Sequence, residues 1–187
     1  MYIDGTVASY RYKPHGLRYQ KIVDGVVETH VWNGANMVAE IDANNQVMVK
    51  YLRGINLICW EDAFQKKGYY LFNAHGDVVQ KRDASTGNLW YYVYDTFGVE
   101  RDVDGQDKSL DANLFRCCGE YFDLETDTVY LRARYYRPEL GRFSRQDSLW
   151  YTTYTLPNDA EAIDPLSLNL YCYCYNNPIL YDDPSAK

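Results

Sequence analysis

The sequence predicts an all-β fold of stacked β-hairpins of about 20 residues each, and three observations carry this prediction. Tyrosine supplies 20 of the 187 residues, against 6 Phe and 4 Trp. Tyrosine favours strands, and its hydroxyl needs a partner or water, so this abundance suits sheets with one half-wet face. A glycine recurs at intervals of 18 to 22 residues, and turn-forming pairs such as Asp24-Gly25 and Asn44-Asn45 separate the copies.

The repeat is clearest in residues 92–100. Tyr92 and Tyr94 alternate along a strand, Asp95 opens a turn, and Gly98 supplies a positive φ. A second strand follows the glycine, and the pair forms one hairpin. Single hairpins cannot bury a face alone, so successive copies must stack into a continuous sheet. The recurring glycines are Gly16, Gly34, Gly54, Gly76, Gly98, Gly119 and Gly141.

Helix signals are weak and short, at residues 61–67 and 159–163. Residues 100–111 are acidic and lack periodicity, which predicts an exposed loop. The spacing of carboxylates in this loop resembles a calcium site only faintly. An EF-hand loop that begins at Asp102 would need glutamate at its twelfth position, where Asn113 stands. We therefore expect a solvated loop and no metal there.

Charge and composition exclude several classes of protein. The net charge of −7 and the pI of about 4.9 argue against a nucleic-acid surface and against docking on anionic lipid. No apolar run is long enough to span a membrane, and residues 1–10 do not resemble a signal peptide. The odd number of cysteines predicts free thiols, and no Cys/His set has the spacing of a zinc site. We expect no metal and no cofactor. The cysteines are Cys59, Cys117, Cys118, Cys172 and Cys174.

Several ordered motifs resemble one known family. The sequence Tyr-Asp-Thr-Phe-Gly at 94–98 resembles the YD repeat, and residues 113–123 and 130–143 are similar to the RHS repeat-associated core. The resemblance divides the chain into YD-type hairpins at 1–108 and the RHS core segment at 109–187. Further matching motifs lie at 144–147, 164–171, 175–178 and 181–187.

The resemblance implies a structural function. RHS proteins form a hollow β-shell wound from YD hairpins, and the core segment plugs one end. We therefore expect a shell-and-plug region that encloses and delivers a C-terminal toxin encoded beyond this chain. The implied partners are that toxin segment, the remainder of the shell, and secretion machinery or cell-surface glycans. The implied location is secreted or at the bacterial cell surface.

The resemblance also implies an aspartyl self-cleavage that releases the toxin. The matching carboxylates are Asp147, Asp164 and Asp183, with Arg145 as a candidate orienting residue. Paired carboxylates can activate water and protonate the leaving group. Asp164 and Asp183 precede prolines, where aspartate is also a common turn residue. The terminal glycine of the family is replaced by Ala186, and a cleaved product would require residues beyond Lys187.

Three further interpretations concern other side chains. Exposed tryptophans could stack on sugar rings and make the surface a glycan-binding module, or the same rings could be packing. Arg132 and Arg134 alternate with apolar residues, which predicts one solvated strand face. A Cys-His or Ser-His hydrolase has little support, because the chain has 3 histidines and two of them, His15 and His75, precede repeat glycines. The tryptophans are Trp32, Trp60, Trp90 and Trp150.

Overall fold

The computed structural model describes residues 5–104, 113–147 and 169–183. The described residues form antiparallel strands and short 3-10 turns, which confirms the all-β prediction. No helix in them is long and apolar enough to cross a membrane. The expected boundary at residue 108 lies outside the described residues, as do Trp150, Asp164, Ala186 and the weak helix signal at 159–163.

Nine strands form one antiparallel sheet in which each strand pairs with its neighbours in sequence. Stacked hairpins are therefore present as the repeat predicts. The strands are β1 (Ala8–Tyr12), β2 (Arg18–Val23), β3 (Val26–Asn33), β4 (Asn36–Ile41), β5 (Val47–Arg53), β6 (Leu57–Asp62), β7 (Lys67–Phe72), β8 (Val78–Asp83) and β9 (Leu89–Tyr91). The segment 61–67 ends β6, turns and begins β7, so it is a hairpin turn rather than a helix.

The hairpin turns use the chemistry that the sequence indicates. Gly98 has φ +85°, and the Asp95 carboxylate accepts hydrogen bonds from the backbone N–H groups of Phe97 and Val99 at 2.9 and 3.0 Å. Six of the seven repeat glycines adopt a positive φ. Gly54 does not, so the prediction for that glycine is wrong. The turn from β5 to β6 closes with a hydrogen bond from Gly54 N to Asn56 O instead.

Two smaller sheets follow the large one. The first pairs β10 (Val93–Tyr94) with β11 (Glu100–Arg101). The second contains β12 (Tyr121–Asp123), β13 (Thr128–Leu131), β14 (Arg134–Arg137) and β15 (Arg142–Phe143) in sequence order. We call this four-stranded sheet the core sheet. The 3-10 turns are η2 (Cys117–Gly119), η3 (Pro138–Leu140) and η5 (Cys174–Asn176).

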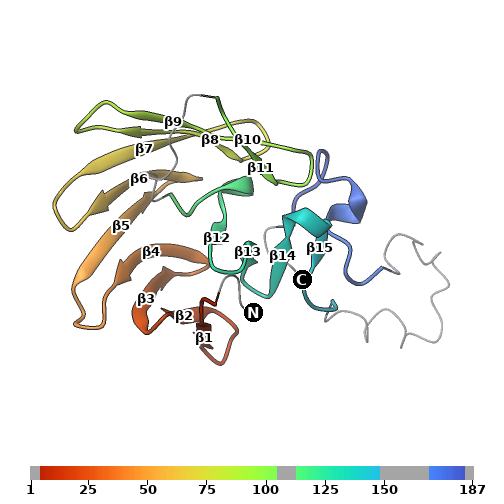
Figure 1. The fold of residues 1–187 in the computed structure, drawn as a ribbon, viewed down its shortest axis with the longest axis horizontal. Helices are drawn as coiled ribbons and strands as arrows, with labels where there is room; N and C mark the ends of the chain where they lie inside the picture. The colour runs from red at the N-terminus through yellow and green to blue at the C-terminus, as the bar shows by residue number, and fades with distance from the viewer. Residues whose placement is uncertain (1–4, 105–112, 148–168, 184–187) are drawn as a thin grey trace.

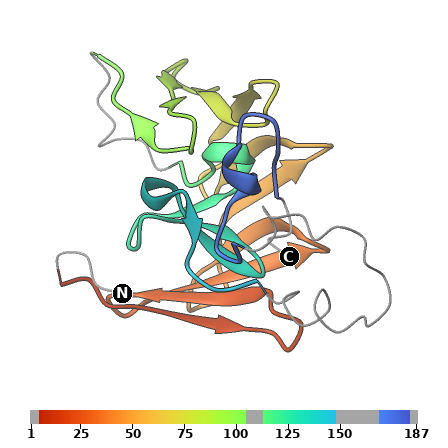
Figure 2. The ribbon, with the colours of Figure 1, turned by 90° about the vertical axis from the view of Figure 1, so that its right-hand side faces the viewer.

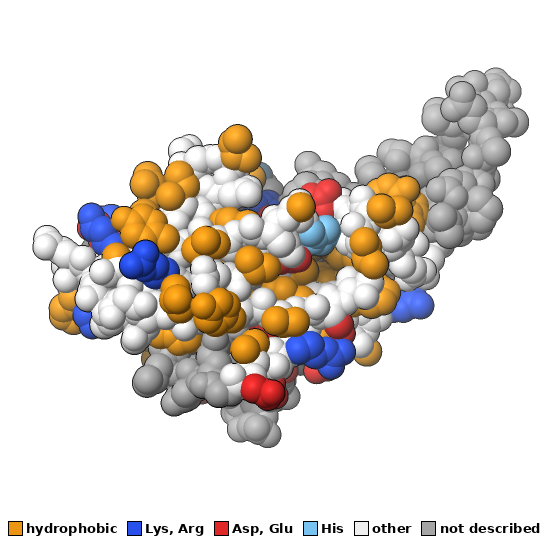
Figure 3. All heavy atoms as spheres, turned by 90° about the horizontal axis from the view of Figure 1, so that it is seen from above, with side chains coloured by type: hydrophobic (Ala, Val, Ile, Leu, Met, Phe, Trp, Pro, Cys, Tyr) orange, Lys and Arg blue, Asp and Glu red, His pale blue; other side chains and the backbone are white. Residues whose placement is uncertain are grey.

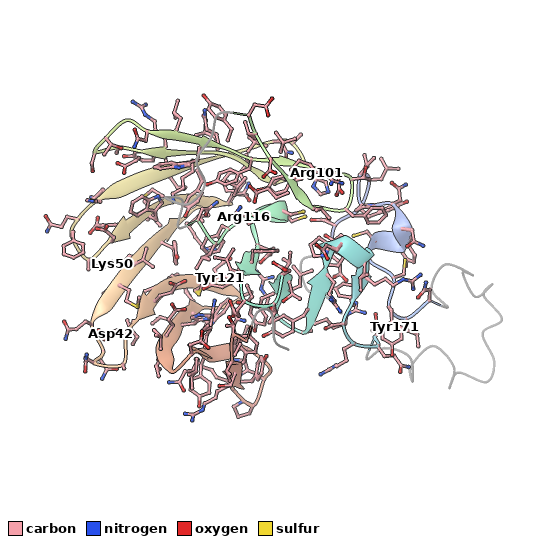
Figure 4. All side chains as sticks on the ribbon, in the orientation of Figure 1. Asp42, Lys50, Arg101, Arg116, Tyr121 and Tyr171 are labelled. Carbon is pink, nitrogen blue, oxygen red and sulfur yellow. The ribbon has the colours of Figure 1, made fainter. Side chains whose placement is uncertain are left out.

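The nine-stranded sheet curves, and the core sheet lies against its concave face (Figures 1 and 2). Phe115 makes the central contact, because its ring centroid lies 4.9 Å from that of Tyr51, 6.2 Å from that of Tyr70 and 5.7 Å from that of Tyr121. These rings belong to one buried cluster that joins both sheets. In Figure 4, Tyr121 and Arg116 lie between the two sheets, whereas Asp42 lies at a hairpin turn on the far rim.

A buried arginine fastens the first hairpin to the core sheet. The Arg18 guanidinium is fully buried and pairs with Asp123 at 2.6 Å. Its central carbon also lies 4.4 to 5.9 Å from the ring centroids of four tyrosines, a range in which cation–π attraction is expected. The abundant tyrosines thus form a cage for a charge as well as an apolar core. The four rings are Tyr10, Tyr121, Tyr130 and Tyr135.

A second attachment joins β8 and β11 to the segment that leads into the core sheet. Arg116 pairs with Glu100 of β11, lies 5.3 Å from the Tyr92 ring centroid, and accepts a hydrogen bond at its carbonyl from Val78 N at 3.1 Å. Residues 116–123 are therefore tied to both the first described hairpin and the β10–β11 hairpin. Seen from above, apolar side chains are spread across the surface among polar ones (Figure 3).

Candidate functional site

Arg134 brings two of the predicted carboxylates together. Its Nη2 atom lies 3.2 Å from Asp147 Oδ2 and 3.3 Å from Asp183 Oδ2. Arg134 begins β14, Asp147 follows β15, and Asp183 follows η5. Residues that are 36 positions apart in the sequence therefore share one guanidinium nitrogen. Asp164 lies outside the described residues.

The surrounding structure holds Arg134 in place. Its side chain is 5% exposed, and its guanidinium carbon lies 3.6 Å from the Phe143 ring centroid. Its Nη1 atom donates to Leu170 O at 3.3 Å, and the same carbonyl accepts the backbone N–H of Asp147 at 3.0 Å. Burial lowers the pKa of Arg134, and the two neighbouring carboxylates oppose that effect. An arginine remains charged under these conditions and can orient both carboxylates.

The segment 169–183 packs against the core sheet and places Asp183 beside Arg134. Tyr173 stacks on Tyr136 with ring centroids 3.9 Å apart, and Phe143 N donates to Tyr171 O at 2.9 Å. Tyr136, Phe143 and Tyr173 are all buried in a second apolar cluster. The position of Asp183 thus depends on aromatic packing that begins ten residues before it.

Arg145, the predicted orienting residue, is exposed and lines a cavity of about 910 Å³ beside Arg134. Arg134 contacts both carboxylates. The expectation that Arg132 and Arg134 share a solvated strand face is wrong, because β13 ends at Leu131 and Arg132 lies in the hairpin turn with φ +63°. Arg132 pairs with Glu120 at 3.0 Å, whereas Arg134 is buried.

The three described tryptophans face the core. Trp32, Trp60 and Trp90 are partly buried and pack against the main apolar cluster. The Trp32 indole N–H donates to Arg18 O at 2.6 Å, and the Lys81 ammonium lies 5.2 and 5.3 Å from the rings of Trp60 and Trp90. These contacts give the rings a packing role within the described structure. Trp150 lies outside the described residues.

The arrangement at Arg134 has a clear chemical capacity. Two carboxylates on neighbouring segments, held by one cation, can divide the roles of base and acid in the hydrolysis of a peptide bond. The sequence motifs indicated both aspartates but not the arginine. The sequence feature that could have indicated Arg134 is its position in an arginine-rich hairpin. The alternation in that hairpin predicts a solvent-facing arginine instead.

Several solved structures share the fold of this chain. The TcdB2-TccC3-TEV crystal structure aligns with 96% of this chain and 9% of its own, with a TM-score of 0.67 and 19% identity. A Tc holotoxin pore of Photorhabdus luminescens aligns over the same shares with a TM-score of 0.65 and 20% identity. The chain therefore has the RHS-type shell fold that its core motifs predict.

Curated relatives share more sequence. The chain is 36% identical over 187 residues to the tRNA3(Ser)-specific nuclease WapA of Bacillus spizizenii, and 34% identical over 186 residues to the tRNA nuclease WapA of Bacillus subtilis strain 168. Each alignment covers 98% of this chain, and the chain spans 8% of the length of each relative. No family model matches the chain.

Proposed function

We propose that this chain is the plugged end of an RHS-type shell that encloses and delivers a toxin segment located C-terminal to it. The observation that carries the proposal is the core sheet seated on the concave face of the nine-stranded sheet and tied to it by the buried Arg18–Asp123 pair. A sheet that fills a concavity closes the space there. The partners are then the rest of the shell and the toxin segment of the same gene product.

The relatives support the assignment of enclosure and of toxic activity to different parts of the whole protein. The WapA proteins are named as tRNA nucleases, and this chain spans 8% of their length. Its net charge of −7 is unsuited to binding tRNA phosphates. We therefore assign enclosure to this segment and any nuclease or other toxic activity to another part of the whole protein, which would be secreted or displayed by a bacterium.

Limited proteolysis of the whole gene product tests enclosure. We expect the segment downstream of this chain to resist a protease in the native protein. Phe115→Asp, which removes the central ring between the two sheets, should expose that segment to digestion, whereas Leu124→Asp at a 53% exposed position should not. Enclosure is refuted when the native protein and both variants lose the downstream segment at the same rate.

A second function is favoured by the geometry at Arg134: self-cleavage of the chain downstream of the core. Asp147 and Asp183 contact the same guanidinium nitrogen at 3.2 and 3.3 Å. They are therefore neighbours, as the acid and the base that act on one peptide bond must be. The bond to be cut would follow the core motif that ends in Ala186. Cleavage would free the enclosed toxin from the shell.

An extended chain tests self-cleavage. A chain that continues past Lys187 and carries Ala186→Gly should yield two products on a denaturing gel. Asp147→Asn and Asp183→Asn should each slow cleavage by at least about 100-fold, because each removes one proton-transfer group. Asp182→Asn, at the exposed neighbour, serves as the matched control and should cleave normally.

Two further variants separate the arginines. Arg134→Gln should slow cleavage, whereas Arg145→Gln should leave it unchanged, since Arg134 makes the contacts to both carboxylates. If the extended chain with all its aspartates intact stays full-length, self-cleavage is excluded. An unchanged rate in both aspartate variants would exclude these carboxylates as its catalysts.

A further inference from the structure

Three side chains of metal-binding type converge on one point away from the Arg134 site. They are His75, Asp77 and Cys118, and their ligand atoms all lie within 4.8 Å of one another. His75 Nδ1 is 3.1 Å from Asp77 Oδ1 and 3.9 Å from Cys118 Sγ. The group joins the turn between β7 and β8 to the η2 turn of the core segment.

Hydrogen bonds between side chains and backbone hold Asp77 and Cys118 in place. The Asn73 carbonyl oxygen of the side chain accepts the backbone N–H groups of His75 and Asp77 at 3.0 and 2.9 Å, and the Asn73 amide donates to Asp77 Oδ2 at 2.8 Å. Cys118 N donates to Asp77 Oδ1 at 2.8 Å, with Cys118 itself at φ +54°. A left-handed residue other than glycine stores backbone strain, and such positions cluster at functional sites.

The orientation of the imidazole argues for coordination rather than for a cysteine nucleophile. A Cys-His-Asp relay uses one ring nitrogen for the thiol and the other for the carboxylate. Here the same atom, His75 Nδ1, faces both Asp77 and Cys118. The three ligand atoms lie within 4.8 Å of one another, which is close enough for them to share one ion.

The donor types select the class of metal. One thiol, one imidazole and one carboxylate are the ligands that Zn²⁺ accepts at about 2.0–2.3 Å, and a soft sulfur ligand disfavours Ca²⁺ and Mg²⁺. Tetrahedral coordination at those lengths places ligand atoms roughly 3.3–3.8 Å apart. The distances of 3.1 and 3.9 Å are close to this range, and all three ligand atoms lie within 4.8 Å of one another, so binding would draw the side chains together.

The cluster also has an entrance. A cavity of about 430 Å³ is lined in part by His75, Cys118 and Asp182, so it reaches two of the three ligands and has room for an ion and a water molecule. On the other side Cys118 Sγ lies 3.7 Å from Cys117 Sγ and 3.5 Å from the Tyr173 hydroxyl. The fourth coordination position therefore faces either solvent or a second thiol.

We propose that His75, Asp77 and Cys118 bind one Zn²⁺ ion, with water from the adjacent cavity as the fourth ligand. The ion would link a hairpin of the shell to the core segment across 43 residues of sequence. Because the unfolded chain has no such site, binding stabilises the attachment of core to shell. This proposal is independent of self-cleavage at Arg134.

Metal titration of the whole chain tests the site. Chain stripped with a chelator is titrated with Zn²⁺ against a chromophoric competitor, and separately with Co²⁺ while the near-ultraviolet thiolate-to-cobalt absorption is followed. We expect one equivalent to bind and the absorption band to appear. Cys118→Ser should abolish the band, and Cys118→Ser, His75→Gln and Asp77→Asn should each weaken Zn²⁺ binding at least about tenfold.

Two cysteine variants act as controls. Cys59→Ser changes a thiol on β6 and should leave both readouts intact. Cys117→Ser should also retain the band, because water completes the site. The thermal unfolding midpoints of the metal-free variants check that each one folds. If Cys118→Ser does not fold, His75→Gln replaces it as the variant that tests Zn²⁺ binding. The proposal is overturned by a wild-type chain that binds no stoichiometric Zn²⁺, or by a cobalt band that survives Cys118→Ser and vanishes in Cys117→Ser.

Discussion

The guanidinium of Arg18 lies 2.6 Å from the carboxylate of Asp123, and both side chains are fully buried although 105 residues separate them. Each charge has lost its hydration, so each depends on the other for compensation. Asp123 has a second cation within reach, the Lys21 ammonium at 3.5 Å, whereas Arg18 relies on Asp123 and the surrounding tyrosine rings.

Removal of one partner should therefore cost far more than removal of both. We expect Arg18→Met to lower the free energy of unfolding by about 3–5 kcal/mol, because it leaves Asp123 buried beside Lys21 alone. The double variant Arg18→Met/Asp123→Leu should recover most of that loss. Urea denaturation measures both. Lys67→Met at the exposed pair with Glu61 is the control and should change little; equal losses in the single and double variants would argue against this account.

Glu40 should make the protein more stable at mildly acidic pH. Burial, aided by the nearby Glu28 carboxylate, raises the pKa of Glu40 from its ordinary value to about 7. A carboxyl whose pKa is raised in the folded state contributes stability that is present below its ordinary pKa and is lost as pH rises through about 7. Glu40→Gln, which mimics the protonated form, should therefore gain on the order of 2 kcal/mol relative to wild type between pH 5 and pH 8.

Glu28→Gln provides the matched test of the cause. Without the neighbouring charge, the pKa of Glu40 should fall and the gain from Glu40→Gln should shrink. Unfolding curves at several pH values measure the difference between the two backgrounds. A gain from Glu40→Gln that is the same at pH 5 and pH 8 would show that Glu40 titrates normally.

His30 should act in the opposite direction. It is 2% exposed, and burial together with the charges of Arg18 and Lys21 lowers its pKa to about 2. Below its ordinary pKa the unfolded chain binds a proton that the folded chain refuses, so stability falls as pH falls toward about 2. Between pH 7 and pH 4, the free energy of unfolding of His30→Leu should therefore fall by about 3 kcal/mol less than that of the wild-type protein. Parallel losses in the two proteins would refute this.

Gly68 should tolerate no side chain. A Cβ at this position of β7 would lie 2.7 Å from the backbone oxygen of Arg82 and would meet the Trp60 indole ring. The neighbouring strand cannot withdraw without breaking its ladder, so Gly68→Ala should destabilise the fold by about 1–3 kcal/mol in thermal or urea unfolding. Gly54→Ala is the control, since its Cβ would meet only the flexible end of Ile58 at 3.1 Å. Equal effects at both positions would contradict the steric explanation.

Local chemistry made the hairpins predictable. The alternating aromatics, the turn aspartate and the glycine at 92–98 predict strand, turn and strand within a few residues. The structure places β10 and β11 around this turn, although Tyr92 itself lies between β9 and β10. Gly54 is the exception, because a different hydrogen bond closes its turn. Short-range rules therefore account for most of the described strands.

Contacts between residues far apart in the sequence could not be predicted from local patterns. Arg134 was expected at the surface because alternation with apolar residues looks the same whether the arginine faces water or a pair of carboxylates. His75, Asp77 and Cys118 lacked any recognisable ligand spacing, since 41 residues separate Asp77 from Cys118 and one donor is a carboxylate. Which hairpin meets which part of the core depends on how the large sheet curves, and the sequence pattern does not encode that curvature locally.

The core segment touches the described hairpins at both extremes, through Arg18–Asp123 near the first and Arg116–Glu100 near the last. Each strand of the large sheet pairs only with its sequence neighbours, so a whole hairpin could be duplicated or deleted without rewiring any ladder. The two attachments remove that freedom. Because Arg116 and Asp123 lie only a few residues apart in the sequence, the two attachments limit how many hairpins can lie between them.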